Sequence, residues 1–202
     1  MPAPSKPAMP HLHATSFDSF ASFDAAAAAF VRAHTSPALS HVMAGISLVH
    51  SQVVLYAVGI ALGFYAWKRG EPRWTMIALV VIPGGLALNA LFKLAFARAR
   101  PLIEGMPSQY DTYSFPSGHS AGATFVYGFL AAYIAFHSST RSVRVAAFVA
   151  AFVMVALVAM SRLVLGVHFA SDVSVGVAWA AVWTAGWIFG LAPRRQREGG
   201  AR

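Results

Sequence analysis

The chain of 202 residues contains no cysteine, and only 11% of its residues carry a formal charge. The lack of cysteine excludes disulfides and thiolate metal ligands. So few charges, together with 57% hydrophobic residues, exclude an ordinary soluble domain. The sequence pattern shows neither an internal repeat nor a second folding unit, and we expect residues 17–192 to form one membrane domain.

The sequence contains several long apolar stretches. Five of them lack a formally charged residue, and each is close to the roughly 20 residues that a helix needs to cross a bilayer. They cover residues 42–67, 74–92, 112–140, 145–161 and 173–193. The sequence therefore predicts an all-α fold, a polytopic membrane helical bundle with five transmembrane helices and an N-terminal interfacial or sixth helix.

The residues before these stretches leave the topology open. Residues 1–16 lack the basic and apolar segments of a cleavable signal peptide, and we expect them to be disordered. Residues 17–34 place phenylalanines on an approximate helical face, which is typical of an interfacial helix. The apolar sequence up to residue 67 forms either a short re-entrant helix and a span or one tilted helix. The N-terminus lies outside with five spans, and inside if residues 25–49 cross as a sixth.

Basic residues give the chain a formal net charge of +8, which in a soluble protein would suggest a nucleic-acid partner. Many of them lie at the ends of predicted spans, so membrane topology explains them better and no nucleic-acid partner is expected. Because spans alternate sides, three basic segments fall on the same side, which the positive-inside rule assigns to the cytoplasm. These segments are 68–73, 141–144 and a basic cytoplasmic tail at 193–202.

The opposite, extracytoplasmic side collects polar residues that interrupt the apolar sequence. Lys93, Arg100 and Arg162 are cations at the edge of a hydrophobic slab, where charges are costly and usually functional. They outnumber Asp172, the carboxylate at the same level. The natural missing partner is a phosphate or pyrophosphate, which accepts forked hydrogen bonds from arginine and a point charge from lysine.

A predicted helix start lies at the same level. Pro116 suits such a start, since its missing N–H would be unpaired there anyway. The N–H groups of Ser117, Gly118 and His119 follow it, and the glycine permits close approach. We expect these groups to complete an oxyanion cradle.

The sequence surroundings of two histidines predict different catalytic roles for them. His168 and Asp172 are spaced i, i+4, so the carboxylate can accept the Nδ1–H and leave the Nε2 lone pair for phosphorus. His168 is therefore the predicted nucleophile. His119 has no such carboxylate nearby in sequence and is better suited to protonate the departing oxygen. A phosphohistidine would form and then be hydrolysed by water.

These residues fall into three short motifs in order along the chain. They are Lys93 and Arg100-Pro101 separated by six residues, Pro116-Ser117-Gly118-His119, and Ser161-Arg162 with His168 and Asp172. The set resembles the signature of the type 2 phosphatidic acid phosphatases, whose superfamily also contains class A bacterial acid phosphatases and vanadium haloperoxidases. Each motif alone would be weak, but three at one predicted membrane face are specific.

The resemblance implies the same roles that the residues suggested, over roughly residues 17–191. It makes His168 the nucleophile, Asp172 its support and His119 the acid. It assigns phosphate binding to Lys93, Arg100, Ser117, Gly118 and Arg162, and it implies no metal and no cofactor. The chain departs from the six-helix members of the family in its poorly defined first span.

Two other functions were weighed. A cluster of histidine, carboxylate and lysine in a membrane also occurs in proton-coupled transporters and channels. Transport sites tend toward the midplane and internally repeated helices, whereas these charges share one edge. Haloperoxidase chemistry is disfavoured because a lipid-embedded site is of little use to a soluble halide. Arg98 fits no motif position and is expected to extend toward lipid headgroups.

The sequence thus predicts a metal-independent lipid phosphatase of a bacterial cytoplasmic (inner) membrane, with membrane lipids around it and its active site on the extracytoplasmic side. Undecaprenyl diphosphate is the favoured substrate because the chain has no extra domain that could recognise a sugar headgroup. Phosphatidylglycerophosphate, phosphatidate and lipid A remain alternatives, and the sequence does not indicate an oligomeric state.

Overall fold

The computed structural model describes residues 15–101 and 112–192. The regular elements in these residues are helices, as predicted. The basic tail expected at 193–202 lies outside the described residues, as do residues 1–14 of the segment expected to be disordered. Thr15 and Ser16, the last residues of that segment, already belong to a 3-10 helix.

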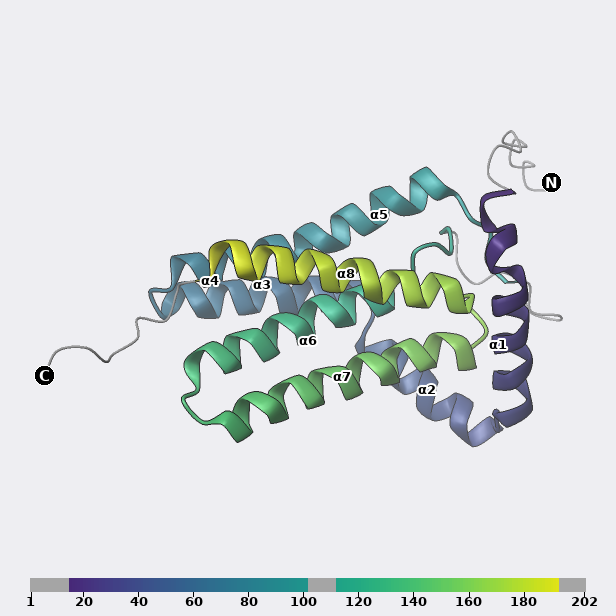
Figure 1. Cartoon of the computed structure of the whole chain (residues 1–202), viewed down its shortest axis with the longest axis horizontal. Helices are drawn as coiled ribbons and strands as arrows, with labels where there is room; N and C mark the ends of the chain where they lie inside the picture. Colours follow the sequence, from purple (N-terminus) through teal and green to yellow (C-terminus); the bar gives the residue numbers. More distant parts are fainter. Residues whose placement is uncertain (1–14, 102–111, 193–202) are drawn as a thin grey trace, which may run out of the picture.

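Most helices follow one another after a few residues, whereas residues 97–117 separate two of them (Figure 1). The helices are η1 (Thr15–Phe20), α1 (Ala21–His34), α2 (Pro37–Val49), α3 (Gln52–Lys68), α4 (Pro72–Leu79), the π-helical turn η2 (Val80–Gly84), α5 (Gly85–Phe96), α6 (Gly118–His137), α7 (Arg141–Val164) and α8 (Ala170–Leu191). By length and composition, four can cross a membrane: the continuous α4–η2–α5, α6, α7 and α8. A fifth span forms if α2 and α3 count as one.

The first span is broken, which the sequence had left undecided. Helices α2 and α3 meet at an angle of 45°. Ser36 caps the start of α2 by accepting the Leu39 N–H, and Pro37 occupies its first turn. The helix then stops at His50, and Ser51 adopts an extended conformation. This segment is therefore two helices that meet at a break, and not one tilted helix.

Proline disturbs the second span within its apolar sequence. Pro83 lies inside η2, where the regular α-helical pattern widens to a π turn. Proline lacks the N–H of a helical hydrogen bond and clashes with the preceding turn, which accounts for the irregularity. The span nevertheless continues to Phe96, and its last turns carry Lys93 toward one end of the bundle.

Large side chains from α4, η2, α5 and α6 fill the centre of the bundle. Trp74, Phe125 and Phe129 are almost completely buried and meet edge to face with neighbouring rings. The outer helix α7 instead exposes apolar side chains, and Phe152 is exposed over 75% of its surface. An apolar face exposed in this way requires a lipid environment, since water would disfavour it.

Helix α1 crosses one end of the bundle instead of joining it, as Figure 1 shows. The chain breaks again at Thr35 before α2 begins, so residues 25–49 do not form one helix. This arrangement supports the interfacial helix and not the sixth span. The end that α1 covers is also the end where α5 finishes, α6 starts and α7 passes into α8.

Candidate active site

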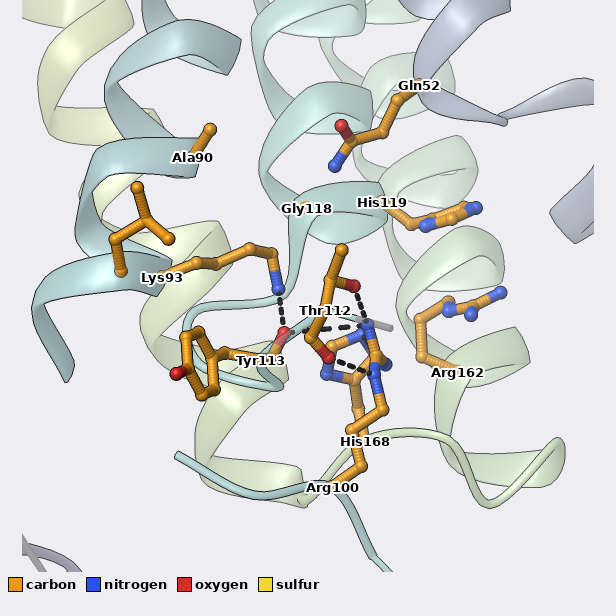
Figure 2. A pocket seen from close by; sticks show the side chains of 11 residues that line it. Gln52, Ala90, Lys93, Arg100, Thr112, Tyr113, Gly118, His119, Arg162 and His168 are labelled. Carbon is orange, nitrogen blue, oxygen red and sulfur yellow. Dashed lines mark hydrogen bonds between the residues drawn. The ribbon is translucent and has the colours of Figure 1, made fainter. Parts of the chain in front are cut away.

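A cavity of about 390 Å³ opens between the helices at the end of the bundle that α1 crosses (Figure 2). Its wall contains the cations Lys93, Arg100 and Arg162 and the histidines His119 and His168. The other lining residues are Gln52, Ala90, Leu94, Thr112, Tyr113 and Gly118. Among the described residues, no acidic side chain lines it. The cavity is therefore suited to an anion that carries an apolar group.

Six of the eight residues predicted for the site line this cavity: Lys93, Arg100, Gly118, His119, Arg162 and His168. They come from α5, the segment after it, the start of α6, the end of α7 and the link to α8. Figure 2 shows Lys93 and His119 on opposite sides, with His168 and Arg100 below them. Asp172 lies behind His168, and Ser117 is fully buried outside the lining.

The His168 ring is held between an acceptor and a donor. Its Nδ1 lies 3.3 Å from Asp172 Oδ2, and its Nε2 lies 3.1 Å from the Arg100 Nη1. Because a carboxylate can only accept and a guanidinium can only donate, Nδ1 carries the proton and Nε2 the lone pair. Burial lowers the pKa of His168 to about 4, although the hydrogen bond to Asp172 opposes this shift. The imidazole is therefore neutral near pH 7.

The position of Asp172 is set by the start of α8. Its Oδ2 also accepts the Phe169 N–H at 3.0 Å, as in a capping box. The carboxylate is completely buried. A negative charge in the first turn of a helix is favoured by the helix dipole, which contributes to keeping this group ionised.

Lys93 and Arg100 are aimed into the cavity by main-chain oxygens. The Lys93 Nζ donates to the carbonyls of Tyr113 at 2.6 Å and Ser114 at 3.2 Å. Arg100 donates from Nε to the Thr112 carbonyl and from Nη1 to the Val167 carbonyl, both at 2.9 Å. The main-chain acceptors of both side chains are thus neutral oxygens and not carboxylates.

Arg162 is tied to the broken first span. It is 1% exposed, and its Nη1 donates to the Ser47 hydroxyl of α2. The same break is fixed by His50, whose Nε2 lies 2.7 Å from the Tyr127 hydroxyl of α6. His50 is buried, and no sequence pattern indicated its contact with Tyr127.

Ser117 differs from its expected role. Its N–H donates to the Asp172 carbonyl at 3.0 Å, and its hydroxyl faces the Ser120 hydroxyl, so neither points at the cavity. A Cβ on Gly176 would come within 2.9 Å of the Ser117 carbonyl, which explains the small residue where α8 meets α6. The predicted cradle is thus reduced to the N–H groups of Gly118 and His119.

Gly118 lies against a neighbour that the sequence did not reveal. A Cβ at this position would meet the side-chain amide of Gln52 of α3, which would have to move. Figure 2 shows the Gln52 amide directed toward the Gly118 end of the cavity. Gln52 follows the break between α2 and α3, and only the tertiary fold brings it to the cradle.

Arg98 was expected to reach lipid headgroups, and this expectation is wrong. Its side chain is 10% exposed and pairs with two buried carboxylates, Asp24 at 2.8 Å and Asp172 at 2.5 Å. Asp24 is the buried residue of α1. In the sequence, only the acidic Asp24 in an alanine-rich segment indicated this contact. It did not indicate that Arg98 is the partner.

The described residues, 15–101 and 112–192, contain no group of three or more histidine, aspartate or glutamate side chains placed to hold a metal ion. The expected independence from metal stays a prediction.

The family described as the PAP2 superfamily matches residues 74–196. The chain belongs to this superfamily. It is 30% identical to phosphatidylglycerophosphatase B of Bacillus subtilis (strain 168) over 138 residues. These residues are 68% of this chain and 68% of the relative.

Two solved structures resemble this PAP2 protein. The crystal structure of the transmembrane PAP2 type phosphatidylglycerolphosphate phosphatase from Bacillus subtilis matches with a TM-score of 0.77 and 27% identity, over 92% of this chain and 94% of that one. Aquifex aeolicus LpxE matches with a TM-score of 0.57 and 21% identity, over 80% and 92%, which shows the fold alone. The predicted family, the all-α membrane fold and the enzyme class, a membrane lipid phosphatase, are confirmed.

Proposed function

We propose that this PAP2 protein cleaves the terminal phosphate from a membrane lipid through a phosphohistidine on His168. One observation carries the proposal: the His168 Nε2 carries a lone pair at the wall of a cavity that is lined by Lys93, Arg100 and Arg162. A neutral, oriented imidazole is the form that attacks phosphorus, and the cations balance the negative charge of the phosphoryl group.

Binding begins with an exchange of partners at Arg100. The guanidinium now donates to the His168 Nε2, and a phosphate in the cavity offers it stronger, charged acceptors. When Arg100 turns to the phosphate, the lone pair of Nε2 is released for attack. The N–H groups of Gly118 and His119, at the N-terminus of α6, are placed to accept another phosphate oxygen.

The chemistry then has two steps. The Nε2 of His168 forms a bond to phosphorus while the bond from phosphorus to the leaving oxygen breaks, and His119 gives that oxygen a proton. In the second step a water oxygen attacks phosphorus, His119 takes a proton from the water, and the bond to Nε2 breaks. Inorganic phosphate leaves, and both histidines return to their starting states.

Two lipids are proposed as the substrate. Phosphatidylglycerophosphate comes first, because the Bacillus subtilis relatives at 30% and 27% identity are named for it. Undecaprenyl diphosphate is the second, because the cavity wall beside Lys93 is apolar at Ala90 and Leu94, which suits a long hydrocarbon chain. Both lipids present a terminal phosphate to the same cations.

We also propose that the site faces the extracytoplasmic side of a bacterial cytoplasmic membrane. The turn between α3 and α4, with Lys68 and Arg69, and the start of α7, with Arg141 and Arg144, lie at the end of the bundle away from the cavity. The positive-inside rule assigns such an end to the cytoplasm.

The test is phosphate release by the purified full chain in detergent from phosphatidylglycerophosphate, undecaprenyl diphosphate, phosphatidate and lipid A. We expect release from at least the first two, unchanged by EDTA, and inhibition by vanadate, which mimics five-coordinate phosphorus. Release from none of the four lipids would overturn the proposed function. Loss of activity in EDTA that added metal restores would overturn metal independence.

A further inference from the structure

A single guanidinium joins the N-terminal helix to the back of the active site. The Arg98 Nη2 donates to Asp24 Oδ2 of α1 at 2.8 Å. Its Nη1 donates to Asp172 Oδ1 of α8 at 2.5 Å and to the Ser171 hydroxyl at 2.8 Å. Asp172 in turn holds the Nδ1 of His168 with its other oxygen. A continuous chain of contacts therefore runs from Asp24 to the imidazole.

Two aromatic rings lie close to the same guanidinium. The Arg98 Cζ lies 4.4 Å from the ring centre of Phe17 and 4.1 Å from that of Phe169. Planar guanidinium groups stack well on such rings. Phe17 belongs to η1 and Asp24 to α1, so the N-terminal segment supplies one of the two stacking rings and one of the two carboxylates that fix Arg98.

Neither Asp24 nor Arg98 is among the described residues that line the cavity. Any effect on the reaction must therefore pass through Asp172. Two carboxylates share one guanidinium in this cluster, so its three charges sum to one negative charge beside His168. Attack by Nε2 places positive charge on the imidazole ring. With Asp24 present, the carboxylate of Asp172 keeps its ability to stabilise that charge, although it is paired with an arginine.

We propose that Asp24 and Arg98 are positioning residues for the His168–Asp172 pair, and that α1 is a working part of the active site. The inference rests on the proposed function, in which His168 is the nucleophile and Asp172 supports it. Removing the charge of Asp24 frees one side of the guanidinium, which can then neutralise Asp172 and pull it from the ring. Misplacement of a catalytic group by about 1 Å costs on the order of 100-fold in rate.

Asp24 also makes a structural contact, and the test must distinguish the effect of that contact from an effect on the reaction. Its Oδ1 accepts the Ser171 N–H at 2.8 Å and its Oδ2 accepts the Ser171 hydroxyl at 2.7 Å, so it also fastens α1 to α8. A merely structural Asp24 would affect stability and expression. A positioning Asp24 affects kcat, and does so only while Asp172 is a carboxylate.

The experiment measures kcat and KM for phosphate release by the full chain carrying Asp24→Asn or Arg98→Gln, each alone and combined with Asp172→Asn. We expect each single change to lower kcat by roughly 10- to 100-fold with little change in KM. In the Asp172→Asn background the same changes should have almost no further effect on kcat, because the group through which they act is gone. Asp18→Asn, an exposed acid of η1, is the matched control and should leave kcat unchanged.

Three outcomes overturn the inference. The first is a normal kcat in Asp24→Asn. The second is an equal loss of kcat with and without the Asp172 carboxylate, and the third is a loss that Asp18→Asn reproduces. If Asp24→Asn does not fold, Phe17→Leu removes one stacking ring and spares both carboxylates. It should lower kcat by roughly two- to fivefold, and an unchanged kcat would contradict the inference. Wild-type protein that releases no phosphate would instead refute the proposed function.

Discussion

Two histidine–carboxylate pairs lie at opposite ends of the bundle, and their second nitrogens differ. At the cavity, His168 Nδ1 faces Asp172, and Nε2 faces the Arg100 Nη1, which is a donor. At the other end, His137 Nδ1 lies 2.8 Å from the Tyr133 carbonyl, and Nε2 lies 3.2 Å from Glu71, so both nitrogens face acceptors. His168 therefore holds a lone pair toward a donor, whereas neither nitrogen of His137 faces a donor.

The carboxylates differ as well. Asp172 is completely buried, while the side chain of Glu71 is 19% exposed. Burial alone would raise the pKa of Glu71, but hydrogen bonds from Tyr133 at 2.7 Å and Arg69 at 3.1 Å outweigh it and hold the pKa below its usual value. Glu71 thus links the α3–α4 turn to α6. A histidine beside a carboxylate is a nucleophile only where its second nitrogen carries a lone pair at an open cavity.

The largest contrast is expected between His168→Ala and His137→Ala. Removing the nucleophile should lower kcat by at least about 10⁴-fold, as for other covalent catalysts, and should abolish the phosphoenzyme. His137→Ala should leave both unchanged. Rapid acid quench with a ³²P-labelled lipid phosphate measures the covalent species. A phosphoenzyme that survives His168→Ala would show that another residue is the nucleophile.

Replacing the two carboxylates sharpens the same comparison. Asp172→Asn should lower kcat by roughly 10²- to 10⁴-fold, because an amide can hold the wrong histidine tautomer. Glu71→Gln should leave kcat near that of the wild type and lower the unfolding temperature, since it weakens bonds to Tyr133 and Arg69. Steady-state kinetics and thermal unfolding in detergent measure both. A catalytic defect in Glu71→Gln as large as that in Asp172→Asn would remove the distinction.

His119→Ala tests the second histidine of the cavity. Loss of the general acid should slow cleavage by roughly 100-fold or more for an alkyl leaving group, which needs a proton. The effect should be much smaller for p-nitrophenyl phosphate, whose leaving group departs without one. Equal slowing of both substrates would assign His119 to phosphate binding and not to proton transfer.

The smallest expected effect is on the pH profile. A histidine with its pKa lowered to about 4 stays neutral at pH values where an ordinary imidazole is protonated. Since the neutral form is the nucleophile, kcat/KM should persist through pH 5 and decline only as pH approaches the lowered pKa. The ionisation of the phosphate monoester near pH 6 must first be divided out. An acid limb at pH 6.5 after that correction would contradict the lowered pKa.

Particular residues show how far the sequence could lead. Lys93, Arg100, Gly118, His119, Arg162 and His168 were predicted from motif spacing and lie around one cavity. Motif spacing predicted these residues because each motif lies at the end of a helix. There, the number of residues between two side chains determines whether they point the same way. Arg98 was misread because its partners are 74 residues away on either side, on α1 and α8. Ser117 was misread because the acceptor of its N–H is on α8.

By itself the sequence determined the membrane bundle, the family and six of the residues that line the cavity, because apolar length and local motif spacing are properties of the chain. The tertiary structure decided which nitrogen of His168 carries the lone pair, where the first span breaks, and how α1 reaches Asp172 through Arg98. These depend on contacts between distant segments, which no local pattern encodes.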